Sequence, residues 1–190
     1  LDSIAMKEED RERKKELLLL PIKEFEEAMS IDPKAQDAAH NLAIAYYHSG
    51  RYAESVQAGL SSIKYNPENA STWSNLGNAY FRNNEFDKAI EALNKSMAMG
   101  LTSDDTYNFL GSSYFNKRDY KTAIVMFNKA LEKKPGQADV LNNLASAYGS
   151  IGDFKNAITA FKRSSEINPS NPQTWYFLGL TYQNIGDAAN

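Results

Sequence analysis

Apolar and small residues return along this chain every 34 residues. Aligned blocks begin at Gln36, Ala70, Asp104, Ala138 and Pro172. When each block is numbered from position 1, apolar, aromatic or small residues stand at positions 4, 7, 8 and 11. Position 11 is a tyrosine in every block: Tyr46, Tyr80, Tyr114, Tyr148 and Tyr182. Residues three or four apart share one face of an α-helix, so these positions predict the buried face of a first helix in each block.

Positions 20, 24 and 27 predict a second helix in the same way. Position 20 holds Ser55, Ala89, Ala123 and Ala157, and position 24 holds Gly59, Leu93, Phe127 and Phe161. Small residues at positions 8 and 20 allow two helices to approach closely, and the large residues fill the space beside them. In the first block, Ser55 and Gly59 are expected to weaken the second helix. Prolines close the second helices at Pro33, Pro67, Pro135 and Pro169, with Leu101 at the corresponding position of the second block.

A turn residue separates the two predicted helices of each block. Most of these residues tolerate a left-handed backbone: Gly50, Asn84, Gly152 and Gly186. Arg118, in the third block, is less suited to that conformation. Each block is therefore predicted to be an antiparallel pair of helices.

This pattern resembles the tetratricopeptide repeat (TPR), a 34-residue helix-turn-helix family with the signature W-x₂-L-G-x₂-Y, A-x₃-F and P. The resemblance covers about residues 18–187. It implies an all-α fold, a right-handed superhelical solenoid of antiparallel helix pairs. The implied divisions are a degenerate repeat's second helix at 18–35, full repeats at 36–69, 70–103, 104–137 and 138–171, and a partial repeat or cap at 172–190.

The two ends depart from the repeat. Residues 1–17 are expected to form a charged helix or a degenerate first helix, because glutamates stand where the signature needs small or apolar residues: Glu8, Glu9 and Glu12. Residues 172–190 match only the first helix of a repeat. Three explanations stay open: this helix caps the array, the chain is a fragment, or the helix contacts a second copy. A turn is predicted at Gly186-Asp187.

Composition and charge argue against several classes of protein. Among 190 residues, 21 basic and 24 acidic side chains give a net charge of −3, so there is no overall field to attract nucleic acid. There is no cysteine, and no apolar run approaches the roughly 20 residues of a membrane span. A cytoplasmic location is favoured, and a periplasmic one is compatible if a leader has been removed.

The chain carries no nucleotide-binding, nucleophile-elbow or zinc-protease motif, so we expect no enzyme activity and no cofactor. The two histidines, His40 and His48, are eight residues apart on one predicted helix. They are therefore separated by about 12 Å along its axis, too far to share a metal ion. Asp104, Asp105 and Asp153 are expected to cap helices.

In the TPR family, the first helices line a concave groove. The resemblance places polar and aromatic candidates there: His40, Asn41, Tyr47, Asn75, Asn78, Phe81, Asn108, Phe115, Asn142 and Asn143. Side-chain amides can donate to and accept from a peptide backbone. Lysine is missing from positions 5 and 9, which argues against the carboxylate clamp of chaperone-binding TPR proteins. The asparagines partly resemble the ladder of O-linked N-acetylglucosamine transferase, but they could equally bridge neighbouring helices.

The sequence thus predicts a non-enzymatic protein–protein interaction scaffold that binds an extended peptide or a partner helix in its groove. Two alternatives stay open. One is a targeting or regulatory arm of a larger enzyme, and the other is a structural protein that assembles with itself through its terminal helices. Expected partners are proteins or peptides, with no nucleic acid and no membrane span.

Overall fold

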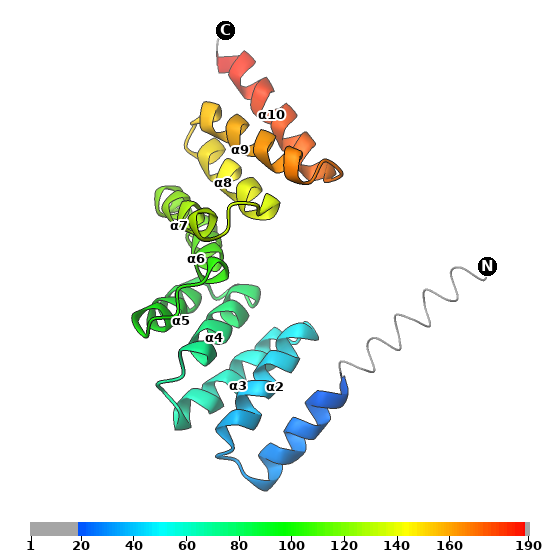
Figure 1. Cartoon of the computed structure of the whole chain (residues 1–190), viewed down its shortest axis with the longest axis vertical. Coiled ribbons are helices and arrows are strands. Elements are labelled where there is room, and N and C mark those ends of the chain that lie inside the picture. Colours follow the sequence, from blue (N-terminus) through cyan, green and yellow to red (C-terminus); the bar gives the residue numbers. More distant parts are fainter. Residues whose placement is uncertain (1–18, 189–190) are drawn as a thin grey trace, which may run out of the picture. The chain divides into compact units, whose positions relative to one another are not determined.

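The computed structural model describes residues 19–188, and all regular secondary structure within that range is helical. A helix at residues 19–31 comes first (Figure 1). It is followed by α2 (Gln36–His48), α3 (Tyr52–Tyr65), α4 (Ala70–Arg82), α5 (Phe86–Ala98), α6 (Asp104–Asn116), α7 (Tyr120–Lys133), α8 (Ala138–Ser150), α9 (Phe154–Ile167) and α10 (Pro172–Ala188). The all-α fold built from antiparallel helix pairs is confirmed. The expectation of a helix at residues 1–17 lies outside the described residues.

The chain forms two compact units, Leu1–Leu101 and Thr102–Asn190, called here the N-terminal and the C-terminal unit. In the N-terminal unit, α2 pairs with α3 and α4 with α5. In the C-terminal unit, α6 pairs with α7 and α8 with α9, and α10 packs on α9. Leu101, which replaces the closing proline of the other repeats, is the last residue of the N-terminal unit.

Glycine at position 8 lets paired helices touch. A Cβ added to Gly77 would lie 2.5 Å from Leu93 Cγ, and one added to Gly111 would lie 2.7 Å from Phe127 Cδ1. Both distances are shorter than carbon atoms tolerate. Leu93 and Phe127 are completely or almost completely buried. The predicted close approach of the two helices therefore depends on the missing side chain at position 8.

The turns between paired helices follow the prediction in four repeats. Gly50, Asn84, Arg118 and Gly152 all have positive φ values of 62–78°. Arg118, at φ 64°, adopts the left-handed backbone although its Cβ makes that conformation costly. The fifth turn was predicted wrongly, since α10 continues through Gly186 to Ala188.

Buried serines at position 27 fasten the second helix to the start of the first. The Oγ atoms of Ser62, Ser96 and Ser164 donate to the carbonyl oxygens of Gln36, Ala70 and Ala138, at 3.0, 2.8 and 2.9 Å. Each acceptor is the first residue of the same repeat. In the third repeat this position is Ala130, which is buried without a hydroxyl. Ser55, expected to weaken α3, is also buried and donates to Ala43 O at 2.7 Å.

Helix capping follows the prediction only in part. Asp153 caps α9 by accepting a hydrogen bond from Asn156 N at 3.2 Å. At α6 the prediction was wrong, because Ser103, not Asp104 or Asp105, accepts from Thr106 N at 3.0 Å. The two aspartates lie in the first turn of α6 instead, where their negative charges interact favourably with the helix dipole and stabilise the helix.

Candidate functional site

The candidate site residues fall into two sets, one in each unit. The N-terminal unit carries six of them on α2 and α4: His40, Asn41, Tyr47, Asn75, Asn78 and Phe81. The C-terminal unit carries four on α6 and α8: Asn108, Phe115, Asn142 and Asn143. All of them lie on the first helices of their repeats, and among them only Asn41 is exposed. The two sets differ in whether their amide groups are already occupied.

In the C-terminal unit the candidate asparagines bridge neighbouring first helices. The side chain of Asn142 exchanges two hydrogen bonds with the buried Thr174 hydroxyl on α10, at 2.9 and 3.1 Å. Asn143 Nδ2 donates to Asn108 Oδ1 on α6 at 3.4 Å. The bridging role, one of the two readings that the sequence left open, therefore applies to all three residues of this unit.

In the N-terminal unit the side chains of the candidate asparagines are unoccupied. Among the described residues, none donates to or accepts from the side-chain amides of Asn41, Asn75 and Asn78. The Oδ1 atom of Asn78 is buried without a hydrogen-bond partner there. A buried acceptor without a donor is unfavourable by about 1–3 kcal/mol. The amides of Asn41 and Asn75, and the amide nitrogen of Asn78, are therefore the groups left to form hydrogen bonds with a bound molecule.

His40 occupies the position that corresponds to Asn142, and it makes the corresponding contact. Its Nδ1 lies 2.8 Å from the Oγ1 of the buried Thr72 on α4. Burial lowers the pKa of His40 below its usual 6.5, an effect that the nearby Asp37 carboxylate partly offsets. Its ring is therefore held towards the neutral form, in which it can share one hydrogen bond with the threonine hydroxyl.

These two contacts reveal a position that the sequence reasoning missed. Position 3 holds a fully buried threonine in three repeats, Thr72, Thr106 and Thr174. The signal was available, because the threonine recurs next to the apolar position 4. It was hard to interpret because a hydroxyl on a buried face needs a partner, and that partner lies on the preceding repeat.

The aromatic residues at position 12 pack within their own repeats. Their rings meet those at position 17, at the start of the second helix. The pairs are Tyr47 with Tyr52, Phe81 with Phe86 and Phe115 with Tyr120, with centroids 5.6, 5.8 and 5.3 Å apart. All three position-12 rings remain half-buried. In the N-terminal unit, Arg82 Nε also donates to the Tyr47 hydroxyl at 3.3 Å, which ties the ends of α2 and α4 together.

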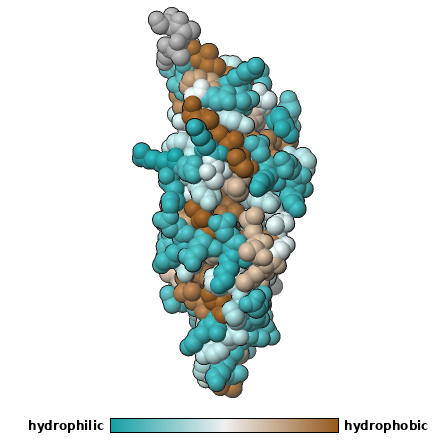
Figure 2. Space-filling model, turned by 90° about the vertical axis from the view of Figure 1, so that its left-hand side faces the viewer, coloured by the Kyte–Doolittle hydropathy of each residue, from teal (hydrophilic) through white to brown (hydrophobic). Residues whose placement is uncertain are grey.

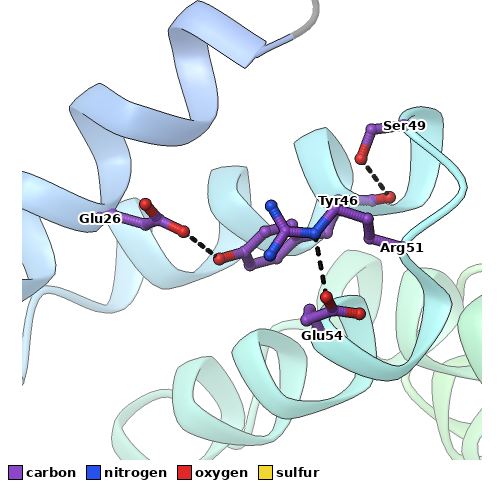
Figure 3. Close-up of polar contacts among 5 residues, drawn as sticks. All are labelled: Glu26, Tyr46, Ser49, Arg51 and Glu54. Atoms are coloured by element: carbon purple, nitrogen blue, oxygen red, sulfur yellow. Dashed lines mark hydrogen bonds and ion pairs between the residues drawn. The ribbon is translucent and has the colours of Figure 1, made fainter.

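A polar cluster fastens the helix at residues 19–31 to the pair α2 and α3 (Figure 3). The Tyr46 hydroxyl donates a short hydrogen bond to Glu26. The Arg51 guanidinium lies 4.4 Å from the centroid of the Tyr46 ring and pairs with Glu54 at 2.9 Å. Burial and the Glu26 carboxylate raise the pKa of Tyr46 to about 12, so its hydroxyl stays protonated as the donor. Each polar side chain of this cluster is hydrogen-bonded or ion-paired within it, so we assign it a structural role.

The described residues contain no group of three or more histidine, aspartate or glutamate side chains placed to hold a metal ion. Within the same range, every helix is too short or too polar to cross a lipid bilayer.

The two tryptophans at position 4 differ from the prediction that this position is buried. Trp73 is half-buried, with its Nε1 bonded to Pro67 O at 2.7 Å and Lys95 Nζ 4.2 Å from its ring. Trp175 is 51% exposed.

Sequence models described as tetratricopeptide repeat match most of the chain. They cover residues 36–63, 70–98, 104–136 and 138–171. No curated protein matches the sequence.

Several solved structures share the fold. A crystal structure of MamA protein is 25% identical, with a TM-score of 0.73, over 81% of this chain and 84% of MamA. MamA residues 41 to the end from Desulfovibrio magneticus RS-1 are 14% identical, with a TM-score of 0.75, over 80% of this chain and 86% of that one. YrrB, described as a TPR protein with an unusual peptide-binding site, is 17% identical, with a TM-score of 0.72, over 85% and 84%.

Proposed function

Because the chain belongs to the tetratricopeptide repeat family, we propose that it is a non-enzymatic scaffold that binds an extended peptide along α2 and α4. The observation that carries this proposal is the set of unoccupied amides in the N-terminal unit. Asn75 and Asn78 lie one helical turn apart on α4, and no described residue bonds to either side chain. YrrB, which shares the fold, is described as having a peptide-binding site.

The chemistry of these side chains suits an extended backbone. An asparagine side chain offers an N–H donor pair and a carbonyl acceptor, which match the C=O and N–H of one peptide unit. Unlike an α-helix, an extended peptide leaves both of these groups unpaired along its whole length. We therefore favour an extended segment over a partner helix as the ligand.

Two half-buried rings lie on the same two helices as the asparagines and would contact the peptide's side chains. Tyr47 and Phe81 are each held from behind by a ring at position 17, so they present a fixed edge. Rigid aromatic surface contributes binding energy at little cost in conformational entropy. An apolar side chain in the ligand is thus expected beside the amide contacts.

The test begins with a random-peptide phage library selected on the purified chain, followed by calorimetric titration of the selected peptide. In the double variant Asn75→Ala with Asn78→Ala, we expect affinity to fall by about tenfold or more, since two hydrogen bonds of about 0.5–1.5 kcal/mol each are lost. Because neither side chain bonds to a described residue, helicity and the melting temperature should stay near those of the parent.

The matched control is Asn94→Ala, which removes an exposed asparagine from α5, a second helix. It should bind the peptide as the parent does. Parent-like affinity in the double variant would show that the peptide does not bind at these amides, and the proposed site would be wrong.

A further inference from the structure

One face of α10 is left uncovered by the described residues. Position 8 of this helix is Gly179, and a Cβ placed there would meet nothing within 4 Å. At the same position of α6, Gly111 lies against the Phe127 ring of its paired helix. The position that receives a large side chain in a complete repeat is therefore open on α10.

Large hydrophobic side chains surround this opening. Trp175, Tyr182 and Ile185 are 51%, 47% and 38% exposed. Trp175 and Tyr182 stand at positions 4 and 11, which face the paired helix in the preceding repeats. Figure 2 shows hydrophobic surface near the C-terminal end of the chain, at the top of the view, where α10 lies. The opposite side of α10 is already buried, because Leu178 and Phe177 pack against Phe161 of α9.

The helix at residues 19–31 has the pattern that fits such a face. By the repeat numbering, it is a second helix that spans positions 18–30, with Phe25 at position 24 and Ala28 at position 27. One side of it packs on α2 through the buried Ile22, and Phe25, which is half-buried, lies partly against the same cluster. On its other side, Pro21 at position 20 is exposed, although alanine at that position is fully buried in later repeats.

The chain's own sequence offers this helix a poor first-helix partner. Where a complete repeat would place an apolar or small residue at positions 7, 8 and 11, residues 8, 9 and 12 are glutamates. Packing Phe25 against them would bury carboxylates beside an aromatic ring at a high desolvation cost. On α10, the same three positions are Leu178, Gly179 and Tyr182, as in an intact repeat.

We propose that α10 of one copy binds the helix at residues 19–31 of a second copy. The contact completes a repeat from two chains: α10 supplies the first helix and the second copy supplies the second helix, with Phe25 seated over Gly179. This interface continues the packing that joins α6 to α7 and α8 to α9 within one chain. It is a heterologous contact, so each copy keeps one free end for a further copy.

Sedimentation velocity of the 190-residue chain over a range of concentrations tests this association. The average mass of the parent should rise with concentration. Two variants block one side each: Gly179→Arg fills the opening on α10, and Pro21→Arg charges the exposed side of the helix at residues 19–31. Both substituted positions are exposed, so the fold should be kept, and each variant alone should remain a monomer.

Mixing the two blocked variants distinguishes the proposed contact from other modes of self-association. Each retains one intact surface, so the mixture should form a 1:1 dimer and nothing larger. Gly149→Arg, at another glycine whose Cβ would meet nothing within 4 Å, is the matched control and should associate like the parent. Self-association of Pro21→Arg alone would indicate that α10 pairs with α10 instead. A mixture that stays monomeric would show that the two surfaces do not bind each other, and a parent that is monomeric at every concentration would show no self-association. Each of these results overturns the proposal.

Discussion

The N-terminal and C-terminal units start their second helices by different chemistry. In the C-terminal unit, Asp119 and Asp153 cap α7 and α9 by accepting hydrogen bonds from backbone N–H groups, both at 3.2 Å. In the N-terminal unit the same position is Arg51 or Glu85, and neither side chain caps its helix. Ion pairs one turn long replace the caps: Arg51 with Glu54, and Glu85 with Lys88.

In the first ion pair the cation comes first along the chain, and in the second the anion comes first. In both pairs the cation lies over the ring of the tyrosine at position 11. Arg51 lies 4.4 Å from the ring centroid of Tyr46, and Lys88 lies 5.4 Å from that of Tyr80. Both tyrosines are the buried residues of position 11. A cation over an aromatic face contributes about 0.5–1 kcal/mol at exposed sites. The comparison teaches that the repeat constrains where the helix begins, but leaves open which polar group stabilises that point.

The largest difference between the units should come from position 24. Phe127→Ala is expected to cost about 3–5 kcal/mol, and its N-terminal counterpart Leu93→Ala about 2–4 kcal/mol, because Gly111 and Gly77 have no side chains that could fill the cavities. Trp73 and Trp175 allow the units to be followed separately by fluorescence during urea unfolding, with the other tryptophan replaced by phenylalanine. A cost below about 1 kcal/mol for Phe127→Ala would contradict the packing of α6 on α7.

The capping comparison predicts a smaller effect. Asp119→Ala and Asp153→Ala should each cost about 1 kcal/mol, whereas Glu54→Ala and Glu85→Ala should cost about 0.5 kcal/mol or less, because each removes a largely exposed ion pair and leaves the cation over its tyrosine ring. Raising NaCl to about 1 M should weaken the N-terminal pairs more than the C-terminal caps. The same two-reporter unfolding experiment measures all four variants. Equal losses in both units would show that the ion pairs and the caps are equivalent.

The smallest expected effect is a pH dependence confined to the N-terminal unit. The pKa of His40 is lowered in the folded chain, so the unfolded chain binds the proton more tightly. Stability should therefore be fully present above pH 6.5 and should fall as the pH drops through the folded pKa of His40. His40→Asn should remove this dependence while keeping a hydrogen bond to Thr72, as Asn142 does with Thr174. The Trp73 signal, recorded from pH 7 to pH 5 during unfolding, checks this, and an unchanged profile in His40→Asn would assign the dependence to other groups.

The sequence was sufficient to predict features that every repeat needs for its backbone to fit. Gly77 and Gly111 were predicted to permit close approach, and Arg118 was predicted to occupy a left-handed turn that suits it poorly. These positions recur because backbone geometry leaves few alternatives. The spacing of 34 residues was therefore enough to predict the fold.

The sequence was less informative about polar partners. A period identifies the face on which a side chain lies, but not the group it meets on the next helix. Asn75 and Asn143 stand at the same repeat position, and yet only Asn143 is bonded, because its neighbour is Asn108 and the neighbour of Asn75 is His40, which bonds to Thr72. Likewise Trp73 could be placed at position 4, but the motif does not specify that Lys95 Nζ lies 4.2 Å from its ring.

The serine bond at position 27 has a consequence for how these repeats can be rearranged. It joins the second helix to the first residue of the same repeat, as Ser96 does with Ala70. A module excised from residue 70 to the end of α5 would thus carry both ends of this fastening with it. A module cut in the middle of α4 would separate them. Recombination at repeat boundaries therefore exchanges self-contained pieces, which gives an array of this kind a route to lengthen or shorten without redesigning its interior.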